Sequence, residues 1–237
     1  MKLLYGYILT WPGYDLACGA PGYREQFREK LLSIREFRVD DRGFGSPQNA
    51  WERLWLDSPV ALHDVTNEGP DSEHRNSDLG GKIRFNYSFL IRVNSKNGTI
   101  IIVSTLYNIT DAVIDYFNLG NAKNLQRKIV DVQKVSQMLM ESEHSKEYSI
   151  TYFLADVPGY GSSLKSITMY GNDISEAEFL REERKKFSAR KIGVRPFDGP
   201  FEAGRFNNFG MIQFRIENIS IFENFLRYAH QHKLFIE

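Results

Sequence analysis

The clearest periodicity in the chain lies between residues 83 and 106. Odd positions from Ile83 to Val93 are apolar or aromatic and even positions are mostly polar, which is the period-two pattern of a strand. Lys96-Asn97-Gly98 then supplies a tight turn, because Asn-Gly tolerates the positive φ that hairpin turns need. Thr99 to Leu106 returns as a β-branched strand. The sequence therefore predicts an antiparallel hairpin here.

Five other segments resemble strands. Residues 3–10 are apolar and stop before Trp11-Pro12-Gly13. Tyr148, Ile150, Tyr152 and Leu154 recur at every second position, as in a strand with these side chains on one face. The remaining predicted strands are 164–170, which would return antiparallel, 190–195 and 209–216.

Apolar residues also recur at helical spacing between these segments. Four helices are predicted in this way: one from Tyr23 to about Phe37, one that begins at Ser46-Pro47, one that begins at Asn108, and one over about 124–141. The second of them would carry Trp51, Leu54 and Trp55 on one face. Two more follow serines with a glutamate three residues later, a spacing typical of capping boxes: Ser175 with Glu178, and Ser220 with Glu223.

Three strand-strand-helix units follow from these assignments. Antiparallel strands with helices set between them favour an α+β fold, with helices packed on one face of an antiparallel sheet or sheets. We expect an N-terminal half over residues 1–120 and a C-terminal half over 121–237, or a single domain that combines them. Residues 61–81 interrupt the first half as a long acidic loop with little apolar content.

Composition narrows the class of protein. The 237 residues carry 30 Lys and Arg against 30 Asp and Glu, so bulk charge does not favour coating of nucleic acid or of an anionic membrane. The single cysteine, Cys18, cannot form an intramolecular disulfide, which favours a reducing, cytoplasmic setting. No apolar stretch is long enough for a bilayer span, so we expect no membrane partner.

One strand end carries a GTPase-like motif. Asp156-Val157-Pro158-Gly159-Tyr160-Gly161 resembles the Asp-x-x-Gly motif of small GTPases, in which the aspartate contacts Mg²⁺ and the glycine senses the γ-phosphate. That family also requires an upstream Gly-x-x-x-x-Gly-Lys-Ser/Thr phosphate loop, which this sequence lacks. We therefore interpret residues 158–162 as a hairpin turn.

A second glycine-containing segment enters a strand near the C-terminus. Gly204 to Met211 resembles the Gly-rich loop of CRISPR repeat-processing endoribonucleases, a likeness that implies paired ferredoxin-like domains and RNA phosphates close to the backbone. The other interpretation is an ordinary loop with a glycine at positive φ, which we prefer.

Basic and aromatic residues interleave between positions 181 and 210. Cations that hold phosphates beside aromatic faces that stack bases are typical of single-stranded nucleic-acid binding. The alternative interpretation is a solvated helix face followed by core phenylalanines. The candidates for binding nucleic acid or another anionic partner are Arg181, Arg184, Lys185, Lys186, Arg190, Lys191, Arg195, Arg205 and Phe206.

The acidic loop suggests a different partner. Its acids, Asp64, Glu68, Asp71, Glu73 and Asp78, would raise the encounter rate with a basic protein such as a nuclease toxin. An insertion without a role explains them equally well.

No catalytic or metal-binding motif stands out. His-Glu-x-x-His, Cys-x-x-Cys and Gly-x-Ser-x-Gly are absent, and His230 and His232 point apart on a helix. We therefore expect no metal, no cofactor and no catalytic residue. The first hypothesis is a non-enzymatic cytoplasmic binding protein of the immunity, antitoxin or bacterial defence-accessory type, acting through protein-protein contacts. The second is a nucleic-acid-binding or ribonuclease-like protein that uses residues 181–210.

Overall fold

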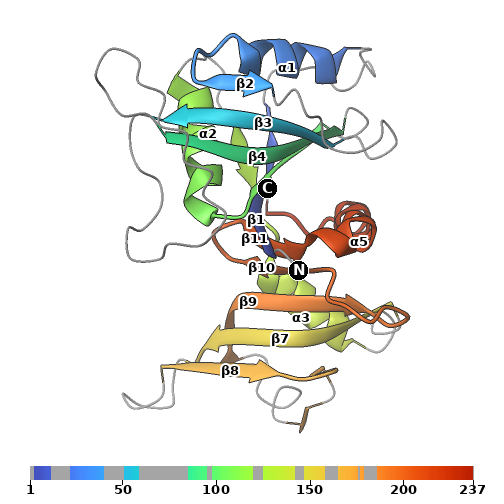
Figure 1. Ribbon diagram of the computed structural model, residues 1–237. Coiled ribbons are helices and arrows are strands. Elements are labelled where there is room, and N and C mark those ends of the chain that lie inside the picture. Colours follow the sequence, from blue (N-terminus) through green and yellow to red (C-terminus); the bar gives the residue numbers. More distant parts are fainter. Residues whose placement is uncertain are drawn as a thin grey trace. The chain divides into compact units, whose positions relative to one another are not determined.

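The computed structural model describes residues 3–11, 22–39, 51–58, 85–94, 98–119, 125–141, 147–157, 165–175, 177–178 and 186–236 (Figure 1). The chain divides into two compact units. The N-terminal unit is Leu4–Arg127, and the C-terminal unit is Met1–Leu3 with Lys128–Glu237. Each unit is described by itself.

The N-terminal unit is an antiparallel sheet with two helices. Its strands lie in the order β2-β3-β4-β5-β1, and β6 pairs with β1. If β2 and β3 are set aside, α1 after β1 and α2 after β5 give a β-α-β-β-α-β order. The elements are β1 (Leu3–Thr10), α1 (Tyr23–Leu32), β2 (Phe37–Val39), β3 (Trp51–Ser58), β4 (Phe85–Asn94), β5 (Thr99–Ser104), α2 (Tyr107–Leu119) and β6 (Gln126–Lys128).

The predicted hairpin is confirmed as β4 and β5. The two strands pair antiparallel from Asn94 opposite Thr99 to Leu90 opposite Val103. Gly98 at the turn has φ 61°, which is the conformation that the Asn-Gly pattern predicts. The strand predicted over residues 3–10 is confirmed as β1.

Aromatic side chains form the core between α1 and α2. Phe27 on α1 and Phe117 on α2 stack with ring centroids 5.2 Å apart, and Trp11 meets their edges at 5.7 and 6.0 Å. The helix predicted from Tyr23 is confirmed, and it ends at Leu32 before β2 begins at Phe37.

The helix predicted after Ser46-Pro47 is wrong where the structure describes it. Trp51, Leu54 and Trp55 belong to strand β3, which pairs with β2 on one side and β4 on the other. Their i, i+3, i+4 spacing matches one helix face. Hydrogen bonding on both sides of β3 outweighs that pattern, because a short apolar run does not distinguish a buried strand from a helix.

The helix predicted over residues 124–141 is about half as long in the structure, where α3 spans Val132–Met140. Residues before it are extended, since Val130 bridges to Phe235 and the Ile129 carbonyl accepts from the Ile236 N–H. Asp131 then caps the helix, its carboxylate accepting from the Lys134 N–H at 2.9 Å.

The strands of the C-terminal unit lie antiparallel in the order β11-β10-β9-β7-β8. Figure 1 shows β9, β7 and β8 as neighbours, with α3 behind them. The elements after α3 are β7 (Tyr148–Asp156), β8 (Ser166–Tyr170), β9 (Ser188–Pro196), β10 (Gly204–Asn207), β11 (Met211–Arg215), the 3-10 turn η4 (Ile216–Asn218) and α5 (Ile219–Gln231). Strand β10 was not anticipated from the sequence.

Stacked phenylalanines hold α5 against this sheet. Phe222 lies parallel to Phe214 at 4.1 Å between centroids, and Phe225 lies 4.7 Å from Phe206. Because α5 begins at Ile219, Ser220 is its second residue, and the predicted Ser220 capping box is wrong. The Ser175 hydroxyl donates to Asp173 at 2.6 Å instead of capping toward Glu178.

A β-bulge in β7 overturns the predicted alternation of that strand. The pairing with β9 shifts between Ile150 and Tyr152, so one extra residue, Thr151, enters β7. Ile150 and Phe153 are buried, whereas Tyr152 and Leu154 are half-buried on the opposite face. The fold class itself is confirmed as α+β with antiparallel sheets, and helices confined to one face stay a prediction.

Candidate functional site

The described basic residues of segment 181–210 lie on two adjacent strands of the C-terminal unit. Arg190, Lys191 and Arg195 belong to β9, Arg205 belongs to β10, and Lys186 lies just before β9. The predicted residues Arg181, Arg184 and Lys185 lie outside the described residues, as do Asp64, Glu68, Asp71, Glu73 and Asp78 of the acidic loop.

Strand pairing separates the two faces of this sheet. Residues directly opposite each other on antiparallel strands share a face. Phe153, Ile192, Phe206 and Ile212 are linked in this way, all four are buried, and Phe206 packs on α5. The prediction that Phe206 contacts a nucleic acid or another anionic partner is therefore wrong, because it is a core residue with 1% exposure.

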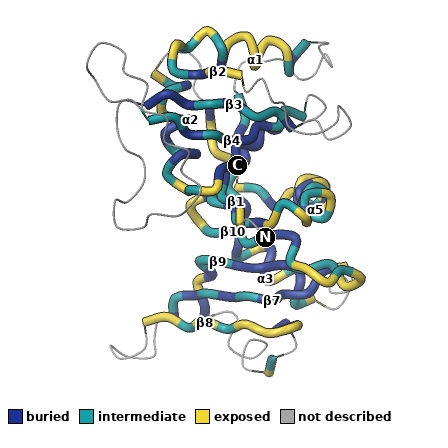
Figure 2. The backbone as a smooth tube through the Cα atoms, in the orientation of Figure 1, coloured by how far each residue is buried: buried dark blue, intermediate teal, exposed yellow. Residues whose placement is uncertain are grey.

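The opposite face carries tyrosines and cations. The register places Tyr170 of β8 opposite Tyr152 of β7, Tyr152 opposite Gly193 of β9, Gly193 opposite Arg205 of β10, and Arg205 opposite Gln213 of β11. We call these five residues the tyrosine–arginine row. The Tyr170 side chain is 80% exposed, and Figure 2 shows exposed positions along β8.

Arg205 is the best-anchored cation of the row. Its guanidinium carbon lies 4.6 Å from the centre of the Tyr152 ring. Its Nε donates to one Glu202 carboxylate oxygen at 2.8 Å and its Nη2 to the other at 3.1 Å. The Thr151 hydroxyl donates to the same carboxylate at 2.8 Å. Arg205 therefore makes a cation–π contact with Tyr152 and a bidentate ion pair with Glu202.

Gly193 allows this close approach. A Cβ at position 193 would lie 2.9 Å from the Tyr152 Cβ and 3.3 Å from the Arg205 Cγ. Any larger residue would therefore push apart the two side chains that form the cation–π contact. The glycine is needed for space here.

Lys191 extends the basic surface beside the row. It lies opposite Asn207 on one side and Leu154 on the other, with its ammonium 5.7 Å from the Tyr152 ring centre. Burial lowers the pKa of this ammonium, the Arg205 cation lowers it further, and Glu202 partly opposes the change. Lys191 and Arg205 therefore form one coupled pair of cations around Tyr152.

Two further basic residues have local partners. Arg190 lies at an irregularity in the β7–β9 pairing, and its Nη1 lies 3.3 Å from a carboxylate oxygen of Asp156. Asp156, the aspartate of the GTPase-like motif, is thus an ion-pair partner at a strand end, and residues 158–161 of that motif lie outside the described residues. Arg195 donates from Nη2 to the Asn172 carbonyl.

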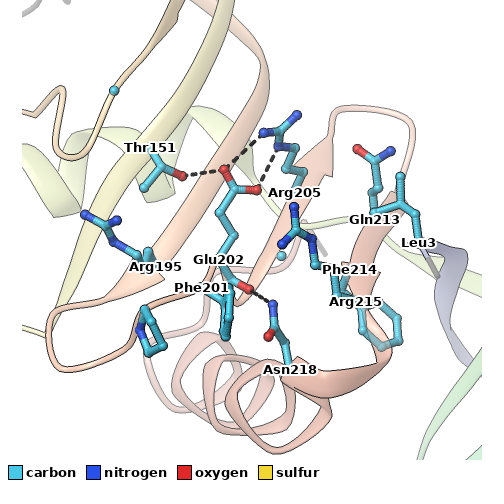
Figure 3. Close-up of a pocket in the computed structure, with 13 residues that line it drawn as sticks. Leu3, Thr151, Arg195, Phe201, Glu202, Arg205, Gln213, Phe214, Arg215 and Asn218 are labelled. Carbon is cyan, nitrogen blue, oxygen red and sulfur yellow. Dashed lines mark hydrogen bonds and ion pairs between the residues drawn. The ribbon is translucent and has the colours of Figure 1, made fainter. Parts of the chain in front are cut away.

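A pocket of about 330 Å³ adjoins the row (Figure 3). Arg205 and Gln213 line it and also belong to the row, so the two features are continuous. Arg195, Arg215 and Glu202 also line it, together with Phe201 from the β9–β10 loop. The Asn218 side-chain amide donates to the Glu202 carbonyl, which fixes the loop at the start of α5.

The glycine-containing segment from Gly204 to Met211 forms β10 and the turn into β11. Asn207 organises the turn, because its side-chain oxygen accepts from the Phe209 N–H at 3.1 Å and the Met211 N–H at 2.8 Å. Gly210 follows with φ 83°. The turn therefore agrees with the preferred interpretation, a loop with a glycine at positive φ, whereas residues 204–207 form a strand instead of a loop.

Metal-binding groups and membrane-spanning helices are both absent from the described residues. In the part of the chain that the structure describes, no group of three His, Cys, Asp or Glu residues lies close enough to hold a metal ion. Among the same residues, no helix is long and apolar enough to cross a membrane.

Of the five residues of the row, the sequence had indicated only Arg205. Tyr152, Tyr170 and Gln213 join Arg205 only through the pairing of β7, β8, β10 and β11. The available signal was Tyr170 at the end of a predicted strand antiparallel to the one that contains Tyr152.

No family model matches this chain, and no curated protein matches it significantly.

Proposed function

We propose that this protein binds single-stranded nucleic acid on the tyrosine–arginine row of its C-terminal unit. The observation that carries the proposal is the direct cross-strand alignment of Tyr170, Tyr152 and Arg205 on one partly exposed sheet face. Base stacking on aromatic rings and phosphate contacts to nearby cations are the two elements of sequence-tolerant single-strand binding.

The two tyrosines have different roles in this proposal. Tyr170, 80% exposed, offers an open ring on which a base stacks. Tyr152 carries Arg205 against its ring and lies near Lys191, so it positions cations for the phosphates on either side of that base. Protein-protein binding through the acidic loop remains a separate prediction, because its residues lie outside the described ranges.

The test is binding of short single-stranded RNA and DNA, followed by fluorescence anisotropy over a salt series. Tyr170→Ala should weaken binding by about 5- to 150-fold, since stacking contributes about 1–3 kcal/mol per base. Tyr107→Ala is the matched control, because Tyr107 is 56% exposed on α2 of the other unit. Lys191→Ala should reduce the slope of log K against log salt by about 0.7.

Two results would contradict the proposal. One is that neither RNA nor DNA binds at low salt. The other is that Tyr170→Ala and Tyr107→Ala bind as tightly as the unmodified chain. Circular dichroism verifies that the variants are folded, which their exposed positions favour.

A further inference from the structure

The pocket beside the row has the size of a small-molecule site. Its volume of about 330 Å³ falls at the lower end of the range of about 300–1,000 Å³ typical of ligand pockets. A ligand of this size is one nucleotide rather than an oligonucleotide. Arg205 and Gln213 belong both to the pocket and to the row, so a nucleotide in the pocket would lie next to a nucleic acid bound on the row.

Charge in the pocket favours an anion. Three arginines and one carboxylate line it, and the Glu202 carboxylate is engaged by Arg205. Arg195 and Arg215, at the ends of β9 and β11, supply the two further guanidinium groups of the pocket lining. The bond from Arg195 to the Asn172 carbonyl orients a guanidinium that has five N–H donors. Guanidinium groups from two strands suit a phosphate, which accepts several such bonds.

An aromatic wall favours a base beside that phosphate. Phe201 and Pro200 line the pocket from the β9–β10 loop, and the Phe201 side chain is 39% exposed. The loop is held where it enters β10, since the Ala203 N–H donates to the Val194 carbonyl at 2.7 Å and the Glu202 carbonyl accepts from Asn218, and at its start, where the Phe197 N–H donates to the Glu147 carbonyl at 3.1 Å. Figure 3 shows Phe201 and Glu202 next to each other on this loop, with the Glu202 carboxylate pointing toward Arg205.

We infer that this pocket binds a nucleoside phosphate, with the phosphate on Arg195 and Arg215 and the base against Phe201. The ligand is the phosphorylated end of a bound strand or a free mononucleotide, and the two share the same chemistry. The strand-end version rests on the proposed function, whereas the mononucleotide version does not.

Four probes distinguish these sources: adenosine 5′-monophosphate, and a six-nucleotide RNA with a 5′-phosphate, with a 3′-phosphate, or with neither. We expect one phosphorylated form to bind about tenfold more tightly than the unphosphorylated RNA, because charge-assisted bonds are among the stronger polar contacts. Arg215→Ala should abolish that preference and leave the affinity for unphosphorylated RNA within about twofold. Arg227→Ala is the matched control, since Arg227 is an exposed arginine on α5 of the same unit.

Phe201→Ala separates the base from the phosphate. It should weaken binding of adenosine 5′-monophosphate and leave competition by inorganic phosphate unchanged, because phosphate alone makes no stacking contact. Arg215→Lys keeps the charge and should retain part of the preference, which controls for any structural effect of the alanine variant.

The failures are distinguishable. If unphosphorylated RNA binds and depends on Tyr170, but no end phosphate and no mononucleotide changes the binding, the inference fails and the proposed function stands. If adenosine 5′-monophosphate binds and depends on Arg215, but no RNA binds, the proposed function fails and the pocket assignment stands. Equal effects of Arg215→Ala and Arg227→Ala overturn the inference.

Discussion

Glu202 engages Arg205, the cation that we propose contacts nucleic acid, so replacing Glu202 with glutamine should have opposite effects on folding and on binding. Its carboxylate accepts from both Arg205 nitrogens and from the Thr151 hydroxyl. The side chains of Arg205 and Glu202 are 36% and 30% exposed. A pair exposed by about a third stays within the surface range, so Glu202→Gln should lower the free energy of unfolding by about 1 kcal/mol.

The same substitution should strengthen binding. No carboxylate then engages Arg205, so its guanidinium can contact a bound nucleic acid. A gain of up to about 1 kcal/mol in binding free energy corresponds to about fivefold in affinity. One additional phosphate contact should also steepen the slope of log K against log salt by about 0.7. Urea denaturation measures the first effect, and anisotropy with single-stranded RNA at several salt concentrations measures the second.

Glu141→Gln is the control for net charge, because Glu141 is exposed at the end of α3. If Glu202→Gln destabilises the fold but leaves both affinity and salt slope unchanged, Arg205 does not meet a phosphate. If affinity falls, Glu202 contacts the ligand itself. Either result refutes the reasoning.

Three other predictions concern the fold around the sites. Gly193→Ala should lower stability by about 0.5–2 kcal/mol in urea denaturation, because crowding against Tyr152 outweighs the better strand propensity of alanine; equal or higher stability would show that the contact relaxes freely. Asn207→Ala should cost about 1–2 kcal/mol in the same assay, since two backbone N–H bonds lose their acceptor, and an unchanged midpoint would contradict this. Burial and the Asp111 hydrogen bond raise the pKa of Tyr7 to about 12. The contribution of neutral Tyr7 to the free energy of unfolding is therefore complete below pH 10 and is lost as the pH rises toward 12, by at most about 1.4 kcal/mol per pH unit. Tyr7→Phe should therefore flatten the loss of stability between about pH 10 and 12, and identical pH profiles would exclude this role.

Local patterns predicted the elements that depend on local chemistry. The Asn-Gly turn and its flanking alternation were sufficient for β4 and β5, and the helical spacing from Tyr23 was sufficient for α1. Trp51, Leu54 and Trp55 show where this reasoning stops. Their neighbours in β2 and β4 are far along the chain, and pairing on both sides decided the structure.

The candidate site follows the same rule. A basic run in the sequence located Lys191, Arg195 and Arg205. It also included Phe206, which the alternation of β10 turns inward. The partners Tyr152 and Tyr170 could not be assigned to the site, because strand register and the extra residue in β7 determine which face they occupy.

The bulge at Thr151 determines which residues of β7 lie on the side of the tyrosine–arginine row. Tyr148 packs on Phe225 and Tyr228 in the interior, whereas Tyr152, four residues later, lies on the side that carries the tyrosine–arginine row. A regular strand would place both on one side. Deleting the codon for position 151 would put Tyr148 and Tyr152 three positions apart in a regular strand, so Tyr152 would stay opposite Gly193 and Phe153 would stay inward. Inserting or deleting one residue in the regular stretch that follows, with no new bulge, would instead exchange the two sides beyond that point, a change that substitution at a single position could not reproduce.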